Sequence, residues 1–198
     1  MEIPEIELVE KLDKVIHVTS EAANKRKDAQ VYGILEYAKK SGDKRSPEKI
    51  KKVTLDSSAC EVAVAKALGG TCNNSEHNPA QPMTYAWDVI VPGYQEETMF
   101  EVKWMSLESD WYSFNDKLIY DVEARRRYYD RIIVATNLPA ECGGWNVYPR
   151  FIIDPIDFSR HVKRSKYDNY KPYYYNHHKP SCTILNEQNI LQRKELKV

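Results

Sequence analysis

Hydrophobic and polar residues follow two different periods along this chain, and the change of period predicts a mixed α/β protein. The first fifty residues place apolar side chains at helical spacing in two stretches, the second of which ends at Ser41-Gly42. The apolar positions are Ile6, Val9, Leu12 and Ile16, and then Val31, Ile34, Leu35 and Ala38. We therefore expect residues 1–55 to form a helical N-terminal arm or subdomain.

A more strongly apolar helix is predicted between Asp56 and Gly69. Asp56, Ser57 or Ser58 is suited to cap its start, and Gly69-Gly70 is suited to end it. The run ACEVAVAKAL between these signals consists almost entirely of small and apolar residues. Such a helix must be buried on most sides, and its small side chains favour close packing on a sheet.

The period then changes to two, which is typical of strands. YAWDVIV, at 85–91, ends at the turn signal Pro92-Gly93, and MFEVKWM, at 99–105, alternates cleanly. A helix is expected from about 115 to 129, a buried strand at 131–136 and a short strand at 150–154. Residues 56–159 therefore form the predicted α/β core. Residues 160–198, which are basic and rich in tyrosine, are expected to be an irregular extension packed on that core.

Composition narrows the class of protein. Apolar residues make up 42% and charged residues 29% of the 198 residues, which is typical of a globular chain. No apolar run is long enough to span a membrane, and the acidic start MEIPEIELVE does not resemble a signal peptide. We therefore expect a cytoplasmic protein with no membrane partner. Four widely spaced cysteines predict reduced thiols, and the alternative of a metal site from His177, His178 and Cys182 lacks a recognised ligand spacing.

The net charge is zero, but the charges are unevenly distributed. The balance of Lys/Arg over Asp/Glu is −4 for residues 1–23, +6 for 24–53, −8 for 54–159 and +6 for 160–198. An acidic centre between basic segments is the pattern of a nuclease, in which carboxylates hold cations and basic flanks meet phosphates. The alternative is that the lysine-rich flanks are solvated surface.

Two acidic residues stand in places where acids are unfavourable. Glu61 lies within the apolar helix, where a buried carboxylate is usually paired, protonated or metal-bound. It could also be a partly exposed residue of the first helical turn. Asp88 interrupts a strand, in which Asp is disfavoured. Its alternative role is a hydrogen bond to a neighbouring turn.

Glu101 and Lys103 are two residues apart on a strand, so their side chains project from the same face. Alone, this spacing also suits an exposed ion pair. In conjunction with Glu61 and Asp88, it predicts one centre to which all four residues point. Clustered carboxylates hold Mg²⁺, which activates water and braces a leaving group, and a lysine neutralises a phosphate.

These residues resemble the PD-(D/E)XK nuclease superfamily. Asp88 in AWDVIVPG and Glu101-Val102-Lys103 in FEVKW match its motif, with Glu61 in the preceding helix and Trp87 where the family pattern has proline. The resemblance covers residues 56–136 and implies a restriction-endonuclease-like αβββαβ core, a mixed sheet flanked by helices. It also implies that Asp88, Glu101 and the Val102 carbonyl bind Mg²⁺, or Mn²⁺ in its place. Glu61 would assist the metal or its water, and Lys103 would position the nucleophile.

The expected partner is DNA, because most members of the resembled superfamily cut DNA. The candidate phosphate contacts are Lys25, Arg26, Lys27, Arg125, Lys163, Arg164 and Lys166. A small stand-alone endonuclease is expected, with a homodimer as a possible assembly. The alternatives are an exonuclease with the same site, a non-catalytic nucleic-acid-binding module on a degenerate nuclease fold, and an α/β interaction domain in which Glu-x-Lys is accidental.

Overall fold

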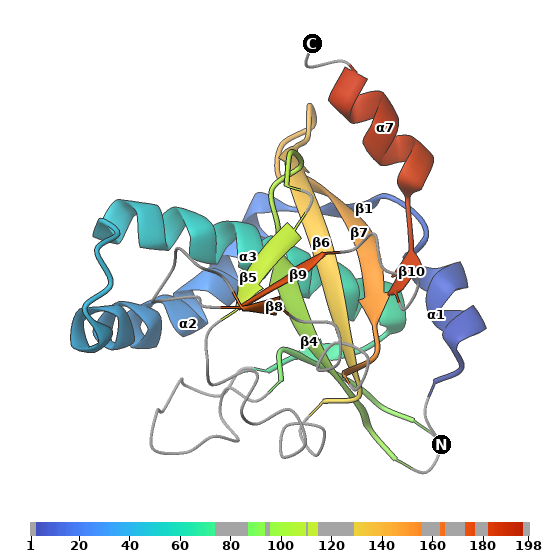
Figure 1. Cartoon of the computed structure of the whole chain (residues 1–198), viewed down its shortest axis with the longest axis horizontal. Helices are drawn as coiled ribbons and strands as arrows, with labels where there is room; N and C mark the ends of the chain where they lie inside the picture. The colour runs from blue at the N-terminus through green and yellow to red at the C-terminus, as the bar shows by residue number, and fades with distance from the viewer. Residues whose placement is uncertain are drawn as a thin grey trace.

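The computed structural model describes most of the chain, and Figure 1 shows how its elements are arranged. The described residues are 3–73, 87–93, 96–109, 111–114, 129–155, 163–164, 173–176 and 182–195. The helices in these ranges are α1 Glu5–Leu12, α2 Ser20–Ser41, α3 Pro47–Leu68 and α7 Glu187–Glu195. The strands are β1 Ile16–Val18, β2 Thr71–Cys72, β3 Val89–Val91, β4 Thr98–Trp104, β5 Trp111–Phe114, β6 Arg131–Pro139, β7 Trp145–Ile153, β8 Lys163–Arg164, β9 Tyr173–Asn176 and β10 Cys182–Ile184.

Local signals explain where the two long helices begin and end. The hydroxyl of Thr19 accepts the N–H of Ala22 at the start of α2, and Gly42 ends that helix in the left-handed conformation at φ 72°. Ser46 caps α3 in the same way, and Gly69 ends it at φ 69°. The predicted stops at Ser41-Gly42 and Gly69-Gly70 are therefore confirmed.

The predicted start of the apolar helix was wrong. α3 begins at Pro47 in its first turn, so Asp56 lies in mid-helix and caps nothing. Ile16, assigned to a helix by its spacing, instead begins strand β1. Lys25, Arg26 and Lys27 lie inside the single helix α2.

One mixed sheet organises the α/β fold, and helices flank it. Its strand order is β1-β7-β6-β4-β3-β2, with β10 also paired to β7. β4 and β6 run parallel, whereas the other neighbouring pairs are antiparallel. A separate three-stranded sheet has the order β5-β9-β8. Figure 1 shows α3 crossing behind the main sheet and the small sheet in front of it.

The core lies on both faces of this sheet. α1, β1 and α3 share one apolar cluster with the inner side chains of β3, β4, β6 and β7. Ile132 and Val134 of β6 instead join a second cluster with Phe151 and Ile153. β6 is thus covered on both sides, as its unbroken apolar sequence predicts. Ile190 of α7 packs in a third cluster with Leu107 and Tyr148.

The sheet draws strands from all three segments that the sequence separated. β1, from the expected N-terminal arm, pairs with β7 at 145–147, and β10, from the expected extension, pairs with β7 at 151–153. The described ends of the chain are therefore built into the core sheet. The predicted helix at 115–129 lies outside the described residues except for Tyr129, which is buried.

No helix in the described ranges has the length and apolar character needed to cross a membrane.

Candidate active site

The hairpin of β3 and β4 brings Asp88 beside the Glu-x-Lys segment. Val89 pairs with Phe100 in the register of this hairpin, and the N–H of Asp88 donates to the Phe100 carbonyl at 2.9 Å. The Asp88 Oδ2 accepts the backbone N–H of Val102 at 2.8 Å. Asp88 is thus fixed against the residue that lies between Glu101 and Lys103, although twelve residues separate Asp88 from Glu101 in the sequence.

Glu101 and Lys103 form an ion pair on β4. The Lys103 ammonium donates to Glu101 Oε1. Phe100 and Val102 belong to the core cluster shared with α3, so strand alternation directs Glu101 and Lys103 to the opposite face. The Glu101 side chain is 5% exposed, whereas that of Lys103 is 34% exposed. The positive charge of Lys103 is therefore the exposed part of this ion pair, and a phosphate can contact it from solvent.

Glu61 is held by residues that the sequence patterns did not assign to it. Arg26 Nε of α2 donates to Glu61 Oε2 at 2.6 Å, and the Gln30 amide donates to the same oxygen at 2.7 Å. The Ser57 hydroxyl, one turn earlier on α3, donates to Oε1 at 3.3 Å. Arg26 also donates to the carbonyl of Asn73. Glu61 is therefore a paired buried carboxylate, and α2 supplies the partners.

Asn73 links the Arg26–Glu61 pair to the hairpin. Its N–H donates to the Asp88 carbonyl at 2.8 Å, and its side-chain amide donates to the Trp87 carbonyl at 3.0 Å. Through these bonds, α2, the strand β2 and the start of β3 are tied together at one place. Arg26 and Gln30 are four residues apart, hence on one face of α2, and that spacing was the signal available in the sequence.

The electrostatics of this region depend on three charged groups. Burial, followed by the negative charge of Asp88, raises the pKa of Glu61 to about 7, although Arg26 and Gln30 act in the opposite direction. Burial alone lowers the pKa of Arg26, but the charges of Glu61 and Asp88 outweigh it and raise that pKa. Asp88 is therefore close enough to act on both groups, and Arg26 stays charged between two carboxylates.

Replacing Glu61 by Gln should stabilise the metal-free protein at about pH 8 and have little effect near pH 4. Because the folded pKa is raised, the protonated carboxyl contributes stability that is complete below 4.5, its ordinary value, and is lost as the pH rises through about 7. Gln resembles the protonated form, so the gain at high pH is on the order of 3 kcal/mol. Urea unfolding of both proteins across this range measures the difference. A Glu61→Gln protein that is less stable than wild type at about pH 8 contradicts the raised pKa of Glu61.

The expected phosphate contacts are placed unequally. Arg26 is 6% exposed and occupied by Glu61 and Asn73, so it lies in the site and not on the surface. Lys25 is exposed, and Lys27 contacts Asn24 and Asp28. Lys163 is exposed on β8, beside Arg164. Arg125, Lys166, His177 and His178 lie outside the described residues.

The carboxylates of this site are few, and this bears on whether they are clustered as metal ligands. Within the ranges that the structure describes, no group of three or more His, Cys, Asp and Glu side chains is arranged to hold a metal ion. The Asp88 carboxylate accepts the N–H of Val102, which is next to Glu101 on β4, whereas Glu61 on α3 interacts with the charge of Asp88 and is bound to Arg26. Of the four predicted residues, Asp88 thus lies beside the backbone of the Glu-x-Lys segment and interacts through its charge with Glu61. The four cysteines are free.

Comparison with known protein families shows that the chain is a nuclease. The matching family is the one described as Bacteriophage T4 endonuclease IV, and the match extends over residues 4–177. The chain therefore belongs to the bacteriophage T4 endonuclease IV family. The matched region contains Arg26, Glu61, Asp88, Glu101 and Lys103, whereas β10 and α7 lie beyond it. No curated protein matches this chain.

Proposed function

We propose that this protein is a metal-dependent endonuclease that hydrolyses DNA, with Asp88, Glu101 and Lys103 at its reaction centre. The observation that carries the proposal is the hydrogen bond from the Val102 N–H to the Asp88 carboxylate. It joins the two separated halves of the Asp and Glu-x-Lys pattern at one point of the hairpin. DNA as the substrate is supported by the endonuclease family to which the chain belongs.

The donor set fits a magnesium ion. Mg²⁺ prefers oxygen ligands, keeps several waters and is commonly held by only one or two carboxylates plus substrate phosphate. Asp88 and Glu101 provide two such carboxylates, and the Val102 carbonyl is the expected third protein oxygen. Mn²⁺ should substitute. When bound, the ion supplies a more acidic water and neutralises charge on the phosphate.

The protein's own side chains then have distinct tasks. Lys103 is half-buried beside Glu101 and is placed to orient the attacking water and to balance the charge that grows on the phosphoryl oxygens. The water oxygen forms the new bond to phosphorus as the bond to the leaving nucleotide oxygen breaks. Arg26 holds Glu61 in place and keeps positive charge near Asp88, which limits repulsion between the two acids.

A restriction-endonuclease-like core is part of the proposal. The order of α3, the β3–β4 hairpin and then β6 parallel to β4 agrees with the helix, strands and later parallel strand of the αβββαβ arrangement. The proposed catalytic residues lie on these elements or beside them, which supports the proposal: Glu61 lies on α3, Asp88 before β3, and Glu101 and Lys103 on β4.

Incubation with covalently closed circular DNA tests this function. With Mg²⁺ or Mn²⁺ we expect nicked or linear products, and with EDTA we expect none. Linear DNA with blocked ends is the matched control, because an endonuclease cuts it internally whereas an exonuclease leaves it intact. Intact circles in the presence of either ion, at protein concentrations that bind DNA, would contradict the proposal.

A further inference from the structure

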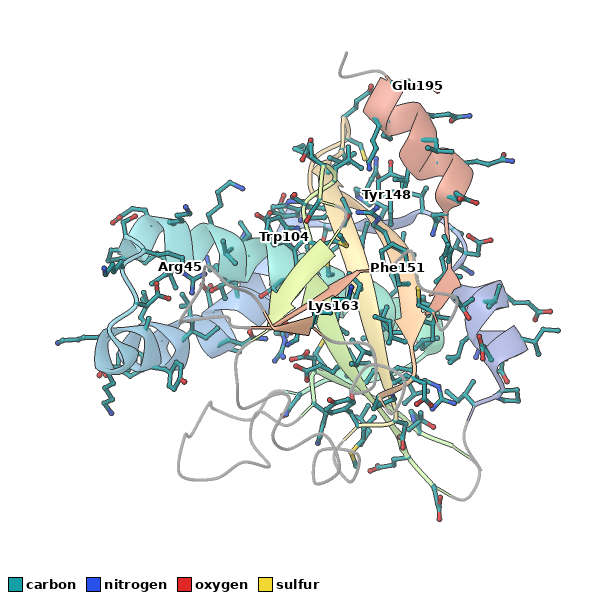
Figure 2. All side chains as sticks on the ribbon, viewed as in Figure 1. Arg45, Trp104, Tyr148, Phe151, Lys163 and Glu195 are labelled. Carbon is teal, nitrogen blue, oxygen red and sulfur yellow. The ribbon has the colours of Figure 1, made fainter. Side chains whose placement is uncertain are left out.

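The hairpin of α2 and α3 carries a dense positive charge at its outer end. Residues 39–52 contain seven Lys/Arg and two Asp/Glu. The lysines of this segment, which we call the basic hairpin end, are all exposed: Lys39, Lys40, Lys44, Lys49, Lys51 and Lys52. Figure 1 shows the two helices projecting together from one side of the sheet, and Figure 2 labels Arg45 at this end.

Most of this charge has no acidic partner among the described residues. Arg45 forms an ion pair with Asp43, and Lys52 contacts Asp56 at 3.0 Å. Across the part of the chain that the structure describes, no salt bridge engages the other five lysines. Their mutual repulsion is therefore uncompensated, and a polyanion would relieve it.

Helix stability accounts for only part of the pattern. Lys39 and Lys40 lie in the last turn of α2, where cations are favoured by the helix dipole. Lys49 lies in the first turn of α3, where the same dipole disfavours them. Lys51 and Lys52 follow directly. Positive charge at the start of a helix is instead suited to binding phosphate.

The basic hairpin end lies at a defined distance from Glu61, whose charge interaction with Asp88 links α3 to the reaction centre. Lys49 and Glu61 belong to the same helix and are twelve residues apart, which corresponds to about 18 Å at 1.5 Å per residue. A DNA strand advances about 3.4 Å per nucleotide, so a strand that follows α3 reaches Lys49 about five nucleotides from the site. Substrates shorter than this cannot contact both places at once.

We propose that the basic hairpin end is a second DNA-binding surface, which grips backbone phosphates about five nucleotides from the bond that is cut. This inference rests on the proposed function. It assigns to Lys49, Lys51 and Lys52 a role in substrate affinity and length preference, with no part in the chemical step. Contacts to phosphate carry no sequence information, so the surface strengthens binding equally for all sequences.

The test compares two triple variants that lose the same charge. The first is Lys49→Ala/Lys51→Ala/Lys52→Ala, and the control is Lys11→Ala/Lys14→Ala/Arg193→Ala, on α1, the turn after it and α7. Binding to oligonucleotides of about 6 and about 24 nucleotides is measured by fluorescence anisotropy in EDTA. For the long one we expect the hairpin variant to bind about 10- to 100-fold more weakly than the control. Its log–log salt slope should be less steep by roughly two to three.

The ratio of long to short affinity separates this proposal from the function on which it rests. In wild type, the longer oligonucleotide should bind more tightly than its larger number of possible binding positions explains. In the hairpin variant, this additional increase in affinity should largely vanish. Equal affinities and salt slopes for the two triple variants overturn the second surface while leaving wild-type cleavage unaffected. Failure of wild type to bind either oligonucleotide overturns both the surface and the proposed function.

Discussion

Lys103→Gln should lower the single-turnover rate of DNA cleavage by about 100- to 1,000-fold. The amide of Gln can still donate to Glu101, so the hydrogen bond on β4 is kept, but the positive charge is removed. The expected loss follows from the charge that develops on the phosphoryl group, which we propose that Lys103 balances. Rates measured at saturating protein and Mg²⁺ report this step without a contribution from binding.

Lys14→Gln is the matched control, because Lys14 is exposed in the segment between α1 and β1. It should cleave like wild type. If Lys103→Gln also cleaves at the wild-type rate while its thermal unfolding is unchanged, the Glu-x-Lys segment is a structural ion pair and the reaction centre lies elsewhere.

Arg26→Met should destabilise the protein by about 3–5 kcal/mol. The substitution keeps much of the side-chain volume but leaves the Glu61 carboxylate buried beside Asp88 without its cation. For a chain of this size the loss corresponds to a fall in Tm of roughly 10 °C. The pKa of Glu61 should rise further, because Arg26 is the group that lowers it.

The neighbouring Lys25→Met is the control, since Lys25 is exposed and its loss should change stability by no more than about 0.5 kcal/mol. Arg26→Met/Glu61→Gln should recover part of the lost stability, because the unpaired charge is then gone. Equal stability of Arg26→Met and Lys25→Met would show that the buried ion pair is not a determinant of this fold.

The local parts of the site follow from the sequence. Strand alternation places Glu101 and Lys103 on one face and Val102 on the other, and the Pro92-Gly93 turn returns the chain so that β4 runs beside Asp88. Gly69 ends α3 because a left-handed residue is needed there. In each case the determining interactions lie within a few residues or within one hairpin.

The parts that the sequence did not predict depend on distant contacts. The partner of Glu61 is Arg26, 35 residues away on another helix, and the four-residue spacing of Arg26 and Gln30 does not by itself point to Glu61. The pairing of β1 and β10 with the two ends of β7 is equally non-local. Their lengths of three residues give too little alternation to indicate a strand.

The start of α3 was misplaced for a different reason. Several residues from Asp56 to Ser58 are good capping residues, and they precede the apolar run directly. In the structure the helix already begins at Pro47, with Ser46 as its cap, and Asp56 instead accepts a hydrogen bond from Asn137 of β6 at 3.2 Å. A local capping signal was therefore overruled by a tertiary contact that holds α3 on the sheet.

The most direct test of the central claim compares wild type with Asp88→Asn on closed circular DNA at equal concentrations of folded protein. Asn keeps the shape of the side chain and can still accept the Val102 N–H, but it lacks the charge needed to hold a cation. We predict that wild type cuts the circles only when Mg²⁺ is present and that Asp88→Asn leaves them closed. Cutting by Asp88→Asn at the wild-type rate, or cutting by wild type in EDTA, would contradict a metal-dependent centre at Asp88, Glu101 and Lys103.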